Sequence, residues 1–324
     1  MATLNQIKAP VDQHLKVFES RFRDSMKSNV SLLDKITRYI VKRKGKQIRP
    51  LYVFFAAGMF GDISERTYRA ASLIELLHTA TLIHDDVVDD SNERRGFFSL
   101  NALWKNKISV LVGDYLLSRG LLLSLDNEDF DLLKLVTSSV REMSEGELMQ
   151  IEKARSLDVE EDMYFEIIRK KTASLIASCL ASGAASAGAS KKDVDTMHAI
   201  GEKAGIAFQI KDDILDFDTG VSKGKPSGTD IKERKMTLPL IHVIKNSSYM
   251  ERRKIINTVK NHGNDPVRVV SLMELVQEKG GIAYAMQHMN AYKDASLKLL
   301  QKMPETPARL SLEQLINFTV SRNM

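Results

Sequence analysis

The sequence predicts an all-α protein, because hydrophobic residues recur with a period near 3.6 along most of its 324 residues. Residues that interrupt helices are scarce, with 17 glycines and 7 prolines. No segment shows the strict alternation typical of a strand or the turn signal of a hairpin. We therefore expect a bundle of roughly ten or more long helices.

The expected helices follow from this periodicity. The clearest of them span Tyr68–Asp90, Ser109–Leu125, Asp129–Ile151, Asp162–Ala189, Asp193–Asp216 and Val267–Glu278. Two starts carry capping residues: Asp62 to Glu65 precedes the first helix, and Asp193 opens the fifth. The tract from Ala181 to Ser190 consists of small residues, which let two backbones approach closely, so we interpret it as helix and not as a linker.

Polar, glycine-bearing segments are expected to form the loops between these helices. They lie at Lys42–Pro50, Asp90–Ser99 and Asp218–Thr229. The last two directly follow acidic helix ends, which is typical of a site whose mouth closes over a ligand. No linker rich in Pro, Ser and Gly divides the chain, so we expect one domain over residues 1–324.

Composition narrows the class of protein. Hydrophobic residues make up 43% and charged residues 27%, as in ordinary globular proteins. The net charge of +5 suits anionic ligands or lipid headgroups but is too small and dispersed to indicate a nucleic-acid partner. No apolar run reaches membrane-spanning length, so no transmembrane segment is expected. The single cysteine, Cys179, excludes an intrachain disulfide and fits a cytoplasmic protein.

The most informative motif is an acidic cluster, DDxxD, that occurs twice in apolar surroundings. Its members are Asp85, Asp86 and Asp89 in the first copy and Asp212, Asp213 and Asp216 in the second. Carboxylates so close together repel one another, and burying them costs free energy unless a cation compensates. Oxygen ligands of this kind indicate Mg²⁺ sites that also bind phosphate.

Helical spacing supports a shared site at each cluster. Asp85 and Asp89 are four residues apart and project from one face, with His78 close to the same line. Gln209 joins the stripe of the second cluster. The alternative is a solvated acidic face, or charges that complement a helix dipole. That alternative carries equal weight for one cluster and becomes less favoured for two.

Cationic residues lie beside the loops that flank both clusters. They are Lys46, Arg49, Arg94, Arg95, Lys170, Lys171, Lys223, Lys225 and Lys235. Any one of them by itself is typical of a solvated surface charge. Their positions relative to the acidic clusters instead indicate a diphosphate ligand. If Lys171 and Thr172 were to lie at a helix start, backbone N–H groups would also favour phosphate.

Further motifs follow in a specific order between Gly45 and Pro239. They are Gly45-Lys46-x-x-Arg49-Pro50, Glu75 to Ala80, the first DDxxD with Arg94-Arg95-Gly96, Gly113-Asp114-Tyr115, Glu142-Met143 with Gly146-Glu147-Leu148, Lys171-Thr172, Phe208-Gln209 with the second DDxxD, and Gly224-Lys225-Pro226 through Asp230, Lys235 and Thr237-Leu238-Pro239. On these residues the chain resembles the trans-isoprenyl diphosphate synthases, and among them the long-chain, octaprenyl-like polyprenyl diphosphate synthases.

The resemblance implies the isoprenoid synthase fold, in which helices surround a deep central cavity, and a homodimer. It implies a site for isopentenyl diphosphate at Lys46, Arg49, His78 and Arg95. It implies a site for an allylic diphosphate, such as farnesyl diphosphate, at Arg94, Lys171, Thr172, Gln209, Lys225 and Lys235. It also implies three Mg²⁺ ions, with Asp85, Asp89 and Asp212 as direct ligands and Asp86, Asp213 and Asp216 acting directly or through water.

The implied reaction fits these residue types. Cations neutralise the charge that builds on a departing allylic diphosphate, and aliphatic helices enclose the carbocation away from water. The isopentenyl double bond then attacks, and the released diphosphate takes up the proton. Contact with a membrane is expected only transiently, during product release.

Product length is implied by two small residues one turn before the first cluster, Ala80 and Thr81. In short-chain relatives this level carries bulky aromatic residues that block the growing tail, so a long product is expected here. The alternative for this pair is ordinary packing of small residues between helices. Three positions depart from the family pattern, namely Lys44, Gln47 and Phe98, and they bear on loop position and isopentenyl affinity.

Three other functions remain as alternatives. The first is a shorter-chain synthase that makes geranylgeranyl or farnesyl diphosphate. The second is a class I terpene cyclase, which would carry one DDxxD and an Asn/Ser/Glu metal motif in place of the second. The third is a non-catalytic subunit of a heteromeric synthase, which would have lost metal-binding or cationic residues that are present here.

Overall fold

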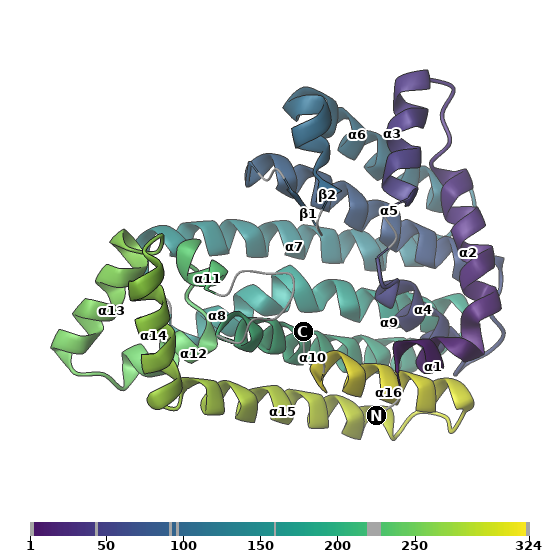
Figure 1. Cartoon of the computed structure of the whole chain (residues 1–324). Helices are drawn as coiled ribbons and strands as arrows, with labels where there is room; N and C mark the ends of the chain where they lie inside the picture. The colour runs from purple at the N-terminus through teal and green to yellow at the C-terminus, as the bar shows by residue number, and fades with distance from the viewer. Residues whose placement is uncertain are drawn as a thin grey trace. The chain divides into compact units, whose positions relative to one another are not determined.

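The computed structural model describes residues 3–42, 45–90, 93–94, 97–158, 160–218 and 228–321, with the backbone alone described for 93 and 94. The described chain is almost entirely helical, which confirms the predicted all-α class (Figure 1). The structure adds a two-stranded antiparallel pair, β1 (Glu93–Arg94) and β2 (Phe97–Phe98). The expectation of no strand was therefore wrong at this point, because strands of two residues are too short to show an alternation.

The helices follow one another along the chain from α1 to α16. The first are α1 (Leu4–Lys8), the 3-10 turn η1 (Ala9–Val11), α2 (Asp12–Ser25), α3 (Ser31–Lys42), α4 (Ile48–Ala57), α5 (Glu65–Val88), α6 (Leu100–Leu125) and α7 (Phe130–Ser156). The next are α8 (Glu161–Ile168), the π-helical turn η2 (Arg169–Ala173), α9 (Ser174–Ser186), α10 (Lys191–Asp216) and α11 (Thr229–Lys232). The last are α12 (Leu238–Lys245), α13 (Tyr249–Asn261), α14 (Pro266–Glu278), α15 (Gly281–Leu300) and α16 (Pro307–Ser321).

The six helices expected from periodicity all exist, with corrections at several of their ends. The fifth does not open at Asp193: α10 starts at Lys191, and the Ser190 hydroxyl accepts the Asp193 backbone N–H at 3.2 Å. The small-residue tract is helical only to Ser186, because Gly188 takes a left-handed conformation with φ 81°. The segment Asp162–Ala189 is interrupted by the π turn, which hydrophobic periodicity does not detect.

The chain contacts divide into two compact units. The first unit consists of 1–140, 176–199 and 300–315, and the second of 141–175, 200–299 and 316–324. The boundaries fall within helices α7, α9, α10, α15 and α16. The expectation of a single domain over residues 1–324 stays a prediction.

The first unit is built around α5 and α6, which run side by side (Figure 1). Their shared core includes Leu76, Ala80, Ile83 and Leu116, all buried. Cys179 on α9 is fully buried and without a disulfide, and burial raises the pKa of its thiol. A buried thiol with a raised pKa is unreactive, so the cysteine has a packing role.

The second unit has an apolar core formed mainly by α10, α12, α14 and α15. Its buried members include Ile210 on α10, Leu240 on α12, Met273 on α14 and Ala285 on α15. Phe217 and Ile231 flank the segment that follows the second acidic cluster. This core therefore anchors both the end of α10 and the short helix α11.

One helix among the described residues, α6, is long and apolar enough to cross a membrane on length and composition alone. Its most apolar window has a mean hydropathy of 1.5 and is 33% buried. One such helix does not contradict the expectation of no transmembrane segment, which stays a prediction. The helix begins at Leu100, nine residues before the expected start at Ser109, and Lys105 has a non-helical backbone with φ 69° within this extension. A core helix of a soluble protein passes the same test.

Close packing of α9 on α4 makes a test of the first unit. A Cβ added at Gly183 would lie 2.3 Å from the Val53 carbonyl oxygen, and backbone atoms cannot move aside cheaply. Gly183→Ala should therefore lower the free energy of unfolding by about 1–3 kcal/mol, measured by urea denaturation. The control is Gly120→Ala, where the atoms nearest the new Cβ are the side-chain ends of Leu77 and Leu73 at 3.3 and 3.4 Å. Equal stability of the two variants would contradict the packing argument.

Candidate active site

The first acidic cluster lies at the C-terminal end of α5. Asp85 and Asp86 belong to its last turn, and Asp89 is the C-cap, whose backbone N–H donates to the Asp85 carbonyl at 2.8 Å. Asp86 is buried, Asp85 is half-buried and Asp89 is exposed. The cluster therefore presents its first and last carboxylates away from the core.

The second acidic cluster lies in the same way at the C-terminal end of α10. Asp212 is half-buried, whereas Asp213 and Asp216 are buried. In both clusters the first Asp stays accessible and the second is buried. The two copies of the motif therefore share the placement of their first two carboxylates as well as their sequence.

Placement at helix C-termini decides between two interpretations of the clusters. The last turn of a helix carries partial negative charge, so acidic side chains there add to it and cost about 0.3–1 kcal/mol each. Neither α5 nor α10 has a basic residue in its last turn. The clusters do not complement a helix dipole, and buried Asp86, Asp213 and Asp216 do not form a solvated face. Both helix ends instead favour a bound cation.

Both oxygens of Asp213 accept hydrogen bonds inside the second unit. Tyr164 donates its hydroxyl to Oδ2 at 2.6 Å, and Gln209 donates its amide to Oδ1 at 2.9 Å. Burial, and after it the Asp230 carboxylate, raise the pKa of Asp213 to about 7 despite these two hydrogen bonds. A divalent cation nearby would restore the ionised form. The donor set of this cluster therefore fits a metal ion.

Asp216 holds the chain that follows the second cluster. Its two carboxylate oxygens accept the backbone N–H groups of Thr229 at 3.1 Å and Asp230 at 2.9 Å. The Gly228 backbone N–H donates to the Asp216 carbonyl at 2.9 Å. The last carboxylate of the motif thus fixes the start of α11, and with it the position of Asp230.

The predicted phosphate-binding pair Lys171-Thr172 lies in the π turn η2, between α8 and α9. It is not at a helix start, so the conditional argument from free backbone N–H groups does not apply. The turn is basic, and its side chains pair with glutamates of α7. The pairs are Arg169 with Glu142 at 3.0 Å, Lys170 with Glu145 at 2.6 Å and Lys171 with Glu147 at 2.5 Å.

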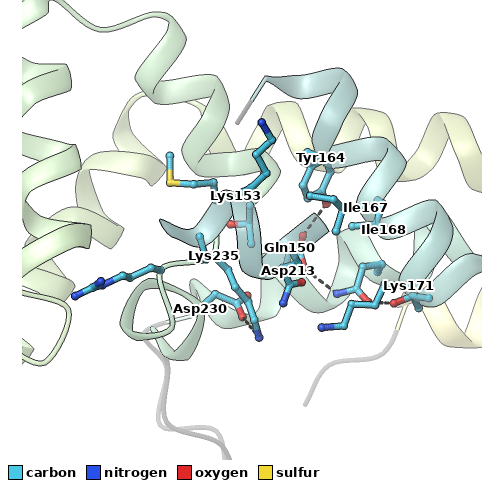
Figure 2. Close-up of a pocket in the computed structure, with 15 residues that line it drawn as sticks. Gln150, Lys153, Tyr164, Ile167, Ile168, Lys171, Asp213, Asp230 and Lys235 are labelled. Atoms are coloured by element: carbon cyan, nitrogen blue, oxygen red, sulfur yellow. Dashed lines mark hydrogen bonds and ion pairs between the residues drawn. The ribbon is translucent and has the colours of Figure 1, made fainter. Parts of the chain in front are cut away.

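Thr172 and Gln209 contact each other. The Thr172 hydroxyl donates to the Gln209 side-chain oxygen at 2.7 Å, and Gln209 in turn donates to Asp213. Tyr164, Asp213, Gln209 and Thr172 therefore form one chain of hydrogen bonds from α8 through α10 to the π turn (Figure 2). This chain orients the Gln209 amide.

Lys235 follows α11 and pairs with Asp230 at 3.5 Å and with Glu233. Burial alone lowers the pKa of Lys235, but the two carboxylates outweigh it and raise the pKa above its usual value. The ammonium group is therefore charged across the physiological range.

A cavity of about 160 Å³ in the second unit brings five of the predicted residues together (Figure 2). They are Lys171, Thr172, Gln209, Asp213 and Lys235. Its lining also includes residues that sequence reasoning did not assign to a site, namely Gln150, Lys153, Ala154, Tyr164, Ile167, Ile168, Asp230, Arg234, Met236 and Thr237. One signal for Tyr164 was present, because it precedes Lys171 by seven residues, two helical turns.

In the first unit, the predicted isopentenyl site is more dispersed. Lys46 is exposed. Arg49 is half-buried and pairs with Glu75 through Nε at 2.6 Å and Nη2 at 3.3 Å. His78 is half-buried on α5. Glu75, which was expected only as part of a motif, is thus a direct partner of Arg49.

A histidine beside the first cluster explains the Gly113-Asp114 motif. His84 Nε2 lies 3.4 Å from the Asp114 carboxylate. A Cβ at Gly113 would lie only 2.2 Å from the same nitrogen, so any other residue would force the ring to turn away from this position. Gly113 and Asp114 on α6 therefore set the position of the residue that precedes Asp85.

Some predicted residues lie outside the described part of the chain. They are Arg95, Lys225 and the side chain of Arg94, and the same holds for Lys44 and Lys223. Within the described residues, no group of three or more His, Cys, Asp or Glu side chains is arranged around one metal position. Asp85 and Asp89 belong to the first unit and Asp212 to the second, so their joint role as ligands stays a prediction.

Comparison with known proteins places the chain in a family. The polyprenyl synthetase family matches residues 30–276. The octaprenyl diphosphate synthase of Escherichia coli (strain K12) is 32% identical over 99% of both chains. Among solved structures, a decaprenyl diphosphate synthase from Rhodobacter capsulatus has a TM-score of 0.92 and 31% identity over 98% of both chains. A polyprenyl synthase from Caulobacter crescentus CB15, in complex with calcium and isoprenyl diphosphate, has a TM-score of 0.90 and 30% identity over 99% of this chain and 98% of that one.

This chain belongs to the polyprenyl synthetase family. Members of the family are prenyl diphosphate synthases, which are prenyltransferases and generally use divalent metal ions. The resemblance stated from the motifs is thereby confirmed, together with the isoprenoid synthase fold class. The individual site residues rest on the motifs and on the contacts within each unit.

The hydrogen bond between Tyr164 and Asp213 makes a test of the site. Tyr164→Phe removes one donor to a buried carboxylate, so it should lower the free energy of unfolding by about 1–3 kcal/mol. The control is Tyr292→Phe, since the Tyr292 hydroxyl has no hydrogen-bond partner among the residues the structure describes, although its ring packs on Phe165. Urea denaturation of both variants and the wild-type protein at one pH measures their free energies of unfolding. A loss no larger than that of the control would show that the bond does not stabilise Asp213.

Proposed function

We propose that the chain is an all-trans polyprenyl diphosphate synthase. It condenses isopentenyl diphosphate head-to-tail onto an allylic diphosphate such as farnesyl diphosphate. The observation that carries this proposal is the pair of acidic helix C-termini together with a cavity lined by Lys171 and Lys235. Acidic helix ends favour metal ions, and the lysines favour the phosphates those ions hold.

The metal is Mg²⁺, with three ions expected. The residues that would hold it are Asp85, Asp89 and Asp212, the members of the clusters that are not buried. Bound Mg²⁺ supplies positive charge beside the leaving diphosphate. Buried Asp213 belongs to the hydrogen-bond network, and buried Asp216 fixes the start of α11. These two carboxylates therefore position the chain around the site. The Caulobacter crescentus polyprenyl synthase is complexed with calcium and isoprenyl diphosphate, which supports a divalent metal ion as the cofactor here.

The allylic diphosphate binds at Lys171, Thr172, Gln209 and Lys235, with Arg94 and Lys225 added from the resemblance. Lys171 pairs with Glu147, and the Thr172 hydroxyl donates to Gln209. A diphosphate would therefore compete with Glu147 for Lys171. Ionisation leaves an allylic cation, the isopentenyl double bond attacks it, and the departed diphosphate accepts the proton lost in elimination.

Isopentenyl diphosphate binds at Lys46, Arg49, His78 and Arg95. The pair with Glu75 uses Nε and Nη2 of Arg49 and leaves Nη1 outside it. Glu75 therefore orients the guanidinium group while its charge still attracts a diphosphate. The exposed Lys46 is free to follow the ligand because it has no packing restraint.

The product is a long polyprenyl chain, octaprenyl-like in length. Thr81 is half-buried, and its hydroxyl donates to the His78 carbonyl at 2.9 Å. Ala80 is buried in the core between α5 and α6. Thr81 is therefore the better candidate for a position that the growing tail passes, and Ala80 has a packing role in addition.

The chain acts as a homodimer in the cytoplasm and contacts membranes transiently during product release. Exposed apolar residues along α6 support a second copy as partner; they include Leu103, Leu111, Leu122 and Leu125. A non-catalytic subunit would need another chain to complete the reaction. Sedimentation of the purified chain at two concentrations distinguishes a dimer from a monomer.

The proposed activity is tested with the purified chain, Mg²⁺, farnesyl diphosphate and isopentenyl diphosphate. We expect elongation without any partner protein, and an Asp85→Ala variant should lose essentially all of it because a metal ligand is gone. Radiolabelled products resolved by chain length provide the measurement. Without elongation by the wild-type chain, a self-sufficient synthase is excluded. A near-normal rate of Asp85→Ala would contradict its role as a ligand.

Chain length is tested by Thr81→Phe. The aromatic ring should block the tail and shift the products to shorter chains, as read from the same product separation. Ala80→Phe serves as the comparison: it should shorten products and also destabilise the fold by about 1–3 kcal/mol, because Ala80 lies in the core. Unchanged products from a folded Thr81→Phe variant would contradict the prediction that a small residue at this level lets the product grow long.

A further inference from the structure

The π turn η2 interrupts an otherwise continuous helical run from Glu161 to Ser186. Its hydrogen bond runs from the Ser174 backbone N–H to the Arg169 carbonyl, five residues back. Such turns hold one residue more than an α-turn and are frequent at functional sites. Because an α-helix rotates by about 100° per residue, this extra residue decides which way the side chains of Lys171 and Thr172 face.

Two glycines lie directly against the backbone of this turn, one on each neighbouring helix. A Cβ added at Gly146 on α7 would be 2.8 Å from the Lys171 backbone nitrogen and 3.2 Å from its Cα. A Cβ added at Gly205 on α10 would be 2.5 Å from the Ala173 Cα and 2.8 Å from its Cβ. Real Cβ atoms do not approach other atoms so closely. Only glycine at these two positions therefore lets α7 and α10 each pack on the backbone of the π turn at the observed distances.

Side chains next to each glycine hold the same turn. Glu147 follows Gly146 and pairs with Lys171, while Gln209 lies one helical turn after Gly205 and accepts the Thr172 hydroxyl. Glu142 and Glu145 pair with Arg169 and Lys170, which the proposed reaction does not use. The turn is therefore held by backbone contact and by polar contact on two sides.

We propose that Gly146 and Gly205 are positioning residues that hold the π turn in place, so that Lys171 and Thr172 meet the allylic diphosphate. This inference rests on the proposed function. A side chain at either glycine pushes the turn away from its helix. Displacement of a binding group by about 1 Å can cost on the order of 100-fold in rate, so small shifts here are consequential.

The experiment measures binding apart from turnover. Inorganic diphosphate with Mg²⁺ is titrated calorimetrically into wild-type, Gly146→Ala and Gly205→Ala protein, and steady-state kinetics follow with both substrates. We expect the Kd for diphosphate and the KM for farnesyl diphosphate to rise by about tenfold or more, with the KM for isopentenyl diphosphate within about twofold. A purely structural role would change the KM values for the two substrates alike. Folded variants whose diphosphate Kd stays within about twofold of wild type overturn the inference.

Gly120→Ala is the matched control, since it also changes a helical glycine but its new Cβ meets leucine side chains of α5 and no backbone. It should leave the Kd for diphosphate and the KM for farnesyl diphosphate unchanged. If the alanine variants do not fold, Glu142→Asp with Glu145→Asp replaces them, because it adds no volume and keeps the charge while shortening two contacts to the turn. That variant should raise the diphosphate Kd by about threefold or more, and an unchanged Kd overturns the inference.

The wild-type protein separates this inference from the proposed function. If wild-type protein neither binds diphosphate nor elongates a prenyl chain, the proposed function itself fails. If wild-type protein does both and the glycine variants match it, only the role of Gly146 and Gly205 fails.

Discussion

The repulsion among carboxylates at the ends of α5 and α10 is the constraint on which the site depends. Each cluster lies where the helix itself contributes negative charge and no basic residue in the last turn offsets it. Such an arrangement is unfavourable unless a cation compensates it. Both helix ends therefore favour a bound cation.

The protein stabilises the buried members of the second cluster with its own donors. Asp213 accepts from Tyr164 and Gln209, and Asp216 accepts two backbone N–H groups. Asp212 is half-buried. Burial thus distinguishes the members of one DDxxD: the buried carboxylates organise the surrounding chain, and the first one is more exposed to solvent. The same order of burial holds for Asp85 and Asp86.

Much of the fold and part of the site could be predicted from residues alone. The spacing of apolar residues located α5, α10 and α14 to within about three residues, since amphipathic periodicity is a local property. The motifs named five residues that line one cavity. The π turn escaped detection because one extra residue leaves the apolar pattern almost unchanged. The role of Ser190 as the residue that caps the start of α10 was missed, because Asp193 three residues later offered an equally good capping signal.

By itself, the sequence determined the helical class, the two acidic clusters and the family, because these depend on residue type and on spacing along the chain. Only the tertiary structure decided which carboxylates are buried, which glutamates of α7 hold the basic turn and why Gly146 and Gly205 must lack a side chain. Those properties depend on contacts between helices distant in the sequence. Periodicity within one helix carries no information about the distance to another backbone.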